Sequence, residues 1–445
     1  TPRILSGSGR PFRPVSCWGG RGVGWLGAMN GAARQSGGDG GGGVGSASPR
    51  SGKAAERKRW KARCKERHLA RVEAVLDSLR SSLPEEVYSP LAEGILMPGD
   101  TWEALASEAA WDEVWSSRVP EAADPAFGGR LCGAPVRRGG TQRGRDAATR
   151  DGTAGVVNPR AARKRWQVAT IALVLRRLLG GWGARPLNDG PIPVVVDFGC
   201  GSGNLVLPLA ALFPGAVFVG IDMKAHAIEL LRERVAASGL TNVRAEQGMI
   251  EQFGEPFDVA VALHACGNAT DYALLAAAQR QAAYVACPCC VGKLKFSAAG
   301  GSSFSLTRTT WQGLGTADQL ERSRQLAAAL SHPRSAWLRS ALASGAAPPE
   351  EAFADLAQAA DFSHESHHAR PELAAAAKRV VELDRIAAAA EAGYRTALAR
   401  LLHHEDDAKT DLLVGVPADS VPDRFGWGWL GSREAAAGEL SRGAG

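Results

Sequence analysis

Short apolar runs alternate with amphipathic stretches along the second half of the chain. The runs predict strands at Val194–Val196, Val217–Ile221, Val259–Leu263, Ala283–Cys287, Tyr394–Leu402 and Asp411–Val416, and a less apolar segment predicts another strand at Val243–Glu246. The stretches between them predict helices at Leu205–Leu212, His226–Ser238, Asp271–Gln281 and Val381–Ala392. Mostly apolar strands separated by helices are typical of a parallel sheet buried on both faces. The pattern therefore predicts an α/β fold.

Two further helices are expected before the first strand. Arg160 begins a basic stretch that turns apolar from Ile171 to Leu178 and ends at Gly180-Gly181. The segment Lys53–Arg71 holds nine Lys or Arg and two Glu, and its apolar residues continue at helical spacing to Leu79. This second helix is either a solvated charged helix or an arm that contacts phosphates.

Composition shifts divide the chain into segments. We expect residues 1–52 to be disordered or to carry a targeting signal, 53–120 to form the basic helix and a small helical region, and 121–153 to be a linker. Residues 155–417 form the α/β domain, with an Ala- and Ser-rich insertion at 296–375, and residues 418–445 form a tail.

The N-terminal segment is unusual in composition. Of the 53 glycines in the 445 residues, 15 lie in residues 1–50, beside six arginines and a single acid, Asp39. Such density of glycine favours disorder, because each glycine loses much backbone entropy on folding. Acid-poor, arginine-bearing leaders also direct proteins to organelles. We expect a cytoplasmic protein, with plastid or mitochondrial targeting as the alternative.

Charge and cysteine usage narrow the function classes. The net charge is +6, which is compatible with nucleic acid as a partner. No apolar run approaches the roughly 20 residues that cross a bilayer, so membrane function is not expected. The eight cysteines include the adjacent pair Cys289-Cys290, which is not the spacing of a secreted disulfide framework. These features indicate a reduced, intracellular protein.

The first predicted strand leads into the most specific motif of the chain. It ends at Asp197, and Gly199-Cys200-Gly201-Ser-Gly203 follows before the next helix begins. Glycines allow positive φ and close approach of a ligand, and the helix N-terminus behind them favours a polar or anionic group. The glycine spacing differs from the dinucleotide fingerprint Gly-x-Gly-x-x-Gly, although a nucleotide-cofactor oxidoreductase domain stays an alternative.

Asp222 follows the second predicted strand, 21 residues after Gly201. An acid at this position accepts both hydroxyls of a ribose. The alternative is a cap of the helix that begins near Ala225. After the third strand, Gly248 and Met249 are expected along the edge of an adenine ring.

The fourth and fifth strands end in residues that can carry chemistry. His264 and Asp271 are candidate bases, although His264 is also compatible with a packed histidine and Asp271 with a helix cap. A further set of residues is expected to line a pocket on the substrate side of the site: Cys266, Gly267, Cys287, Pro288, Cys289 and Cys290. We expect no metal, since Cys-x-Cys-Cys is an unusual spacing for zinc. Structural zinc and a cysteine nucleophile are the alternatives to small pocket-lining side chains.

The glycine motif and Asp222 resemble motif I of the class I S-adenosylmethionine (SAM)-dependent methyltransferases. The resemblance implies a Rossmann-like, mostly parallel seven-stranded sheet with helices on both faces. It also implies that Gly199, Gly201 and Gly203 line SAM, that Asp222 binds its ribose, and that Asp197 orients the loop or the methionine moiety.

Two segments sharpen this resemblance. Leu263-His264-Ala-Cys266-Gly267-Asn-Ala-Thr270-Asp271 and Cys287-Pro288-Cys289-Cys290 look like the methyltransferase domain of the glutathione S-transferase C-terminal domain-containing protein family, with support from Glu382-Leu-Asp384-Arg385. The tRNA acceptor-stem 2′-O-methyltransferases are more distantly similar. The transferase domain of the first family and the zinc modules of the second are not recognised here.

These features predict a SAM-dependent methyltransferase that modifies RNA, either tRNA or rRNA. The basic helix starts and the family resemblance carry the RNA part of the hypothesis. A protein methyltransferase and a non-catalytic SAM-binding scaffold are the alternatives.

Overall fold

The computed structural model describes residues 49–83, 111–125, 159–180, 191–294, 330–361, 370–400 and 411–418. Most of the expected N-terminal segment, linker and tail lies outside these ranges, as do Lys295 and residues 296–329 of the insertion. The chain divides into two compact units, Thr1–Lys58 and Arg59–Gly445. The sheet and the helices that cover it belong to the second unit.

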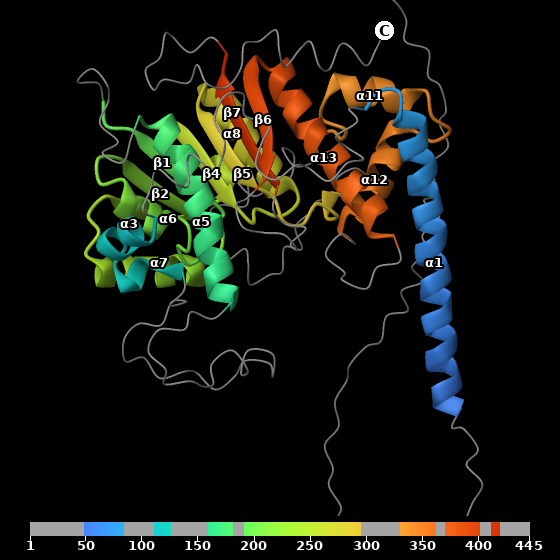
Figure 1. Cartoon of the computed structure of the whole chain (residues 1–445), viewed down its shortest axis with the longest axis horizontal. Coiled ribbons are helices and arrows are strands. Elements are labelled where there is room, and N and C mark those ends of the chain that lie inside the picture. The colour runs from blue at the N-terminus through green and yellow to red at the C-terminus, as the bar shows by residue number, and fades with distance from the viewer. Residues whose placement is uncertain are drawn as a thin grey trace, which may run out of the picture. The chain divides into compact units, whose positions relative to one another are not determined.

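The second unit is built on a seven-stranded sheet (Figure 1). Its strands are β1 (Val194–Phe198), β2 (Val217–Asp222), β3 (Val243–Gln247), β4 (Val259–Leu263), β5 (Ala283–Cys287), β6 (Tyr394–Arg400) and β7 (Asp411–Pro417). Their spatial order is β3-β2-β1-β4-β5-β7-β6, and β7 runs antiparallel to both of its neighbours. The predicted fold, a mostly parallel seven-stranded sheet, is confirmed.

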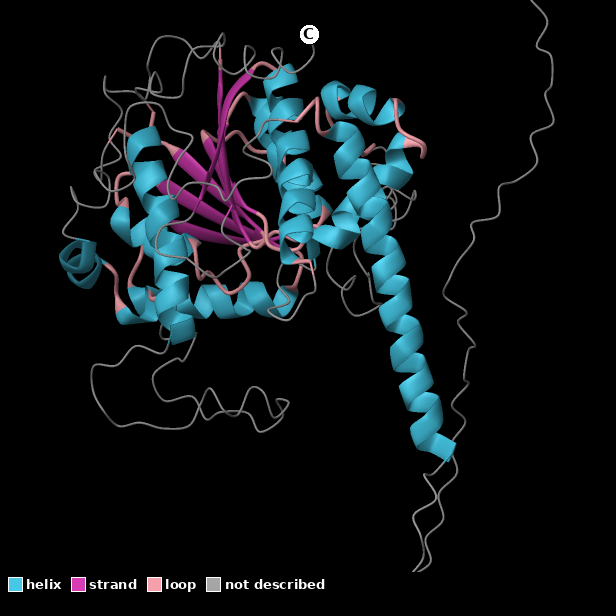
Figure 2. Cartoon of the chain, turned by 45° about the vertical axis from the view of Figure 1, so that its right-hand side comes forward, coloured by secondary structure: helices cyan, strands magenta, loops and turns pink. Residues whose placement is uncertain are grey.

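Alternating strand residues serve two separate cores. Val195 faces the helices α5 (Pro159–Leu178), α6 (Val206–Leu212) and α7 (Ala225–Ser238). Val196 faces the opposite side, which α8 (Asn268–Arg280) and α13 (Pro371–Glu391) cover. Figure 2 shows the strands lying between helices. Because successive strand residues point to opposite faces, an apolar run buries side chains on both sides.

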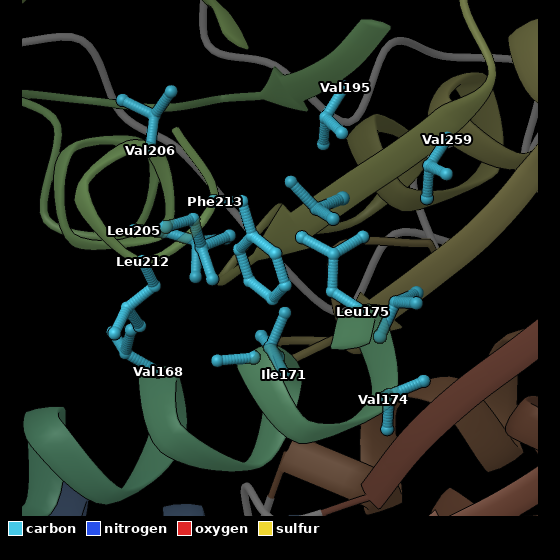
Figure 3. Close-up of a cluster of buried hydrophobic side chains, with 14 of the residues drawn as sticks. Val168, Ile171, Val174, Leu175, Val195, Leu205, Val206, Leu212, Phe213 and Val259 are labelled. Carbon is cyan, nitrogen blue, oxygen red and sulfur yellow. The ribbon is translucent and has the colours of Figure 1, made fainter. Parts of the chain in front are cut away.

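Helix α5 supplies much of the first core. Val168, Ile171 and Leu175 recur at three- and four-residue spacing and point toward Phe213 and Val259 (Figure 3). Each of these five side chains is nearly inaccessible to solvent. A basic helix start thus continues into the element that covers β1, β4 and β5.

A second helical layer lies beyond α13. Helix α1 (Pro49–Leu79) buries Leu69, Val72, Leu76 and Leu79 in one cluster with α11 (Ala336–Ala343), α12 (Pro349–Ala360) and α13. The Arg71 guanidinium donates two hydrogen bonds to the Asp355 carboxylate, at 2.8 and 2.9 Å. The amphipathic end of the basic helix therefore packs on helices of the insertion.

Helix α3 (Trp111–Arg118) and the short 3-10 helix η2 (Glu121–Ala123) pack on the first core of the sheet. The Trp115 indole donates to Asp124 at 2.9 Å, and Arg165 of α5 pairs with the same carboxylate. Arg234 of α7 donates to the backbone carbonyl of Ala122 at 2.9 Å. These contacts join the segment to the sheet, whereas the domain boundaries given above stay a prediction.

Helix α13 begins at Pro371, well before the predicted start at Val381. Its first turns are rich in alanine, and alanine carries no polar–apolar contrast from which a helical face can be recognised. Among the described residues, no helix combines the length and apolar character needed to traverse a bilayer.

Candidate active site

The sheet reverses its strand order between β1 and β4. From β1 the chain moves outward to β2 and β3 on one side, and then returns to β4 and β5 on the other. Loops that leave the carboxyl ends of β1 and β4 therefore diverge, and α/β proteins bind ligands in the crevice between such loops. Asp197, Asp222 and His264 lie at or next to the carboxyl ends of β1, β2 and β4, respectively.

The loop after β1 is held open by left-handed glycines. Gly199 has φ 81° and Gly201 has φ 56°, values that side chains disfavour. A Cβ added at either residue would meet no atom within 4 Å, so both α-carbons face open space. The amides of Gly199 and Cys200 donate to the Ile221 carbonyl at 2.8 and 3.0 Å. The loop is thus fixed to β2 and exposes its glycine faces to a ligand.

Gly203 and Cys200 differ from this pattern. A Cβ at Gly203 would lie 2.5 Å from the Leu231 side chain, so this glycine allows helices α6 and α7 to pack closely. Cys200 is buried in the first core and lies against Gly220. For both residues only the backbone is positioned to meet a ligand, which sequence reasoning did not distinguish.

Asp222 connects the ends of β2 and β1. Its Oδ2 accepts from the Gly201 amide at 3.0 Å, and its Oδ1 accepts from the Lys224 amide at 2.8 Å. The side chain is half-buried. Each carboxylate oxygen has a second lone pair, so the group can still accept two hydroxyls. The Lys224 contact fixes the turn before α7, but Asp222 does not cap that helix: the N-cap residue is Lys224, whose side chain forms no capping hydrogen bond.

Asp197 is the most perturbed acid of this loop. It is 1% exposed, and its Oδ2 has no hydrogen-bond partner within the described part of the chain. Burial, followed by the nearby Asp222 charge, raises the pKa of Asp197 to about 8, against a hydrogen bond from the Val206 amide. A buried carboxyl with an unused acceptor is suited to a cationic ligand group, which would favour its charged form.

Gly248 and Met249 follow β3 on the far side of Asp222. The Gly248 amide donates to the Asp222 backbone carbonyl at 3.1 Å, and a Cβ at Gly248 would meet nothing within 4 Å. Met249 is 7% exposed and precedes the 3-10 helix η4 (Ile250–Gln252). An open backbone beside an apolar side chain is compatible with one edge of a planar ring.

His264 lies at the carboxyl end of β4 in a left-handed conformation, with φ 63°. Its side chain is exposed, and Nε2 lies 3.2 Å from Oε1 of Gln167 on α5. When Nε2–H donates to this oxygen, the lone pair of the neutral imidazole lies on Nδ1. Gln167 therefore orients the ring, and the sequence offers no signal that connects these two residues.

The loops after β4 and β5 bring three thiols together. The sulfur atoms of Cys266, Cys289 and Cys290 lie within 4.8 Å of one another, while Cys287 is buried in the first core. Contacts with the neighbouring thiols and burial raise the pKa of Cys289 well above its usual value. A thiol that is protonated at neutral pH is a poor nucleophile, so the raised pKa argues against Cys289 as a nucleophile.

Asp271 lies in the first turn of α8, but it neither caps the helix nor faces open space. Both of its oxygens accept from Arg385 of α13, at 3.1 and 2.8 Å, and both side chains are 2% exposed. Although burial raises it, the Arg385 charge lowers the pKa of Asp271 to about 2. A buried carboxylate held by arginine is a weak base, so the geometry gives Asp271 a structural role.

Helix α13 supplies further polar contacts that sequence reasoning missed. Asp384 accepts from the amides of Arg334 and Ser335 at 2.7 and 2.8 Å and so fixes the start of α11. Glu382 and Asp411 share the Lys378 ammonium in a buried network between α13 and β7. The motif Glu382-Leu-Asp384-Arg385 thus connects the sheet, α8 and the insertion.

These residues fit SAM. Its methionine end carries a cationic amine, for which Asp197 Oδ2 is an unused buried acceptor. Its ribose carries two hydroxyls, for which Asp222 keeps acceptor lone pairs. The open α-carbon faces of Gly199, Gly201 and Gly248 leave room for a ligand along the loops between these two acids.

Comparisons with known proteins point to the same chemistry. Residues 163–296 match a family model described as "Methyltransferase domain". The Drosophila melanogaster glutathione S-transferase C-terminal domain-containing protein homolog is 30% identical over 226 residues, which cover 50% of this chain and 32% of that protein. The human glutathione S-transferase C-terminal domain-containing protein is 36% identical over 98 residues, or 22% of this chain and 16% of the relative.

A bacterial relative differs in name. Ribosomal RNA small subunit methyltransferase G of Porphyromonas gingivalis is 38% identical over 90 residues, which cover 20% of this chain and 41% of that protein. This chain spans less than half the length of each of these three relatives. The match over residues 163–296, the seven-stranded sheet and the glycine loop agree on a methyltransferase domain in this part of the chain.

Proposed function

We propose that this protein transfers the methyl group of SAM to RNA at the carboxyl ends of β1 and β4. The observation that carries the proposal is the pair of acids around an open glycine loop. Asp222 accepts the Gly201 amide, and Asp197 keeps a buried oxygen without a partner in the described residues. The two acids are set for the two polar ends of one cofactor.

In this proposal the loop residues hold the cofactor rather than react with it. Asp197 pairs with the amine, Asp222 accepts the ribose hydroxyls, and Met249 packs beside the adenine. The sulfonium methyl of SAM is activated in itself, so the protein chiefly aligns an acceptor with it and excludes water. Fixing the loop by backbone hydrogen bonds to Ile221 reduces the motion that would spoil such alignment.

His264 is the proposed base. The carboxyl end of β4 lies next to β1 in the sheet, so His264 is placed beside the cofactor loop. It is exposed and oriented by Gln167. Its Nδ1 would accept the proton of an acceptor hydroxyl or ring nitrogen as the methyl group is transferred.

The acceptor class rests on charge. Arg59, Arg63 and Arg67 recur every four residues on α1 and are exposed, and Trp60 is 45% exposed beside them. A basic stripe with an exposed aromatic ring suits phosphates and unstacked bases. By contrast, Arg165, within the other basic helix start, is held by Asp124. The rRNA methyltransferase named above also supports an RNA acceptor.

The insertion contacts both α1 and the loop that follows β5. Asp361, which directly follows α12, accepts from the Gly292 amide at 2.9 Å, and Val291 and Leu294 pack in the same cluster as α1 and α12. Gly292 lies two residues after Cys290, in the loop that follows β5. We therefore assign α1 and the insertion to acceptor recognition.

The test is transfer of labelled methyl from SAM to fractionated RNA and protein from cells that lack the gene. Label in tRNA or rRNA that disappears on nuclease digestion is the expected result. Label in protein alone would replace RNA with a protein acceptor. Binding of SAM without any transfer would favour a scaffold.

We also propose that the protein acts in the cytoplasm. The adjacent pair Cys289-Cys290 is not the spacing of a secreted disulfide framework, which supports a reducing compartment. Fractionation of cells that express the tagged full chain tests this: enrichment in plastids or mitochondria would overturn it.

A further inference from the structure

The loops after β4 and β5 are connected to each other by backbone hydrogen bonds. The His264 amide donates to the Cys287 carbonyl at 3.1 Å, and the Gly267 amide donates to the Cys290 carbonyl at 2.9 Å. His264 and Gly267 both have positive φ, at 63° and 59°, so the β4 loop bends sharply at each side of Cys266. A non-glycine residue in this conformation stores strain that the surrounding structure must hold.

The bend carries Cys266 to the adjacent pair on the other loop. Its sulfur lies 3.3 Å from that of Cys289, and the sulfurs of Cys289 and Cys290 are 3.6 Å apart. All three lie within 4.8 Å of one another, and the group contains no carboxylate. The local spacing Cys-x-Cys-Cys does not predict this arrangement, because the third sulfur is that of Cys266, on a separate loop.

We propose that Cys266, Cys289 and Cys290 form a three-thiolate site for Zn²⁺. A tetrahedral zinc with Zn–S bonds of about 2.3 Å separates its sulfurs by about 3.8 Å. The spacing of the three sulfurs is close to this value, so small side-chain rotations complete the site. Thiolates select soft and borderline cations over magnesium or calcium.

The fourth coordination position faces the acceptor side. Cys289 is buried, but Cys266 and Cys290 are half-buried, so solvent reaches the group from their side. Zinc sites with three protein ligands keep the fourth position for water. The ion would lock the two loops together beside His264, which extends the role of this region beyond the proposed methyl transfer and does not depend on it.

Cobalt titration of the full chain tests the site. The reduced, metal-stripped protein is titrated with Co²⁺, followed by Zn²⁺ in competition, and zinc per chain is measured by mass spectrometry after reconstitution. We expect about one equivalent of metal, with thiolate-to-cobalt charge-transfer bands and the intense d–d bands of a tetrahedral ion, displaced by Zn²⁺.

Cys266→Ser and Cys289→Ser should each weaken cobalt binding at least about tenfold and diminish these bands. Cys64→Ser is the matched control, because Cys64 lies on α1 outside the group and its loss should leave the bands unchanged. Circular dichroism establishes that each variant is folded. Absence of the bands in the wild-type protein, or equal bands in all four proteins, would overturn the site whether or not methyl transfer is observed.

Discussion

The cofactor side and the acceptor side of this site are built in different ways. After β1 and β2, backbone amides and glycines do most of the positioning, and Gly201 contacts Asp222 only 21 residues further along the chain. After β4 and β5, side chains from distant segments do it: Gln167 orients His264 across 97 residues, and Arg385 holds Asp271 across 114. The first arrangement suits a cofactor of fixed shape, and the second can vary with the acceptor.

The largest effect should come from the acceptor side. His264→Asn keeps a residue that tolerates positive φ but removes the proposed base. We expect kcat to fall by about 10²- to 10⁴-fold, since general base catalysis contributes this much. SAM affinity, measured by calorimetry, should stay within about twofold because the change lies outside the glycine loop.

A His264→Asn enzyme that keeps wild-type kcat would show that this histidine only packs. Gln167→Ala sharpens the result. It should shift the pH dependence of kcat because the imidazole loses its orienting partner, whereas a merely structural contact would change stability alone.

The buried ion pair beneath the acceptor side should dominate stability. Arg385→Met removes both hydrogen bonds to the buried Asp271 carboxylate and leaves it only the Arg334 guanidinium, 3.9 Å away, which costs about 3–5 kcal/mol of unfolding free energy. The double variant Arg385→Met/Asp271→Leu should recover part of this loss. Urea unfolding measures both changes.

The pH dependence of the unfolding free energy tests the same ion pair. The folded pKa of Asp271 is lowered to about 2, so the stability that it contributes is complete above its unfolded pKa of about 3.9 and is lost as the pH falls toward 2. The double variant should lose this part of the acid dependence. An unchanged acid profile would contradict the ion pair.

Two glycines of similar conformation allow an effect on SAM binding to be separated from an effect on stability. Gly201 has φ 56° and Gly239 has φ 69°, and a Cβ meets no atom within 4 Å at either. Alanine should therefore cost both sites about 1–2 kcal/mol of stability. Only Gly201→Ala should also weaken SAM binding, by about tenfold or more, because its Cβ enters the space assigned to the cofactor.

Asp197 should give SAM binding a pH dependence. The carboxyl has a raised pKa of about 8 in the ligand-free chain, so below that pH a proton must leave before the charged form can pair with an amine. We expect affinity to rise up to about tenfold per unit between about pH 6 and pH 7. Asp197→Asn should flatten this slope in calorimetry, and a wild-type profile without a slope would contradict the pairing.

The smallest effect is expected from the α1 stripe. Replacing Arg63 and Arg67 by glutamine should lower the slope of log K against log salt for RNA by up to about 2, because each contacted phosphate contributes about 0.7–0.9. Arg80→Gln/Arg118→Gln removes equal charge at two other exposed positions and is the matched control. Equal losses in both variants would indicate nonspecific attraction.

The difference between the two sides also explains what the sequence could predict. Most of the strands follow from apolar runs, although β3 contains Arg244 and Glu246 and is less apolar. Asp197, the glycines of the loop and Asp222 are close in sequence and adjacent to strand ends, so the local sequence pattern is sufficient to find them. The Asp271–Arg385 and His264–Gln167 contacts are not predictable from one sequence, because each depends on how distant helices pack. The role of Gly203 needed the position of Leu231, and the third sulfur of the thiol group needed the bend at His264.

Calorimetric titration of the full chain with SAM tests the central assignment most directly. We expect saturable binding by the wild-type protein and a loss of about tenfold or more in Asp222→Ala, since charge-assisted hydrogen bonds contribute about 1.5–3 kcal/mol each. Gly239→Ala, at a site remote from the loop in sequence, should bind as the wild type does. Undiminished binding by Asp222→Ala, or no binding by the wild-type protein, would contradict the account.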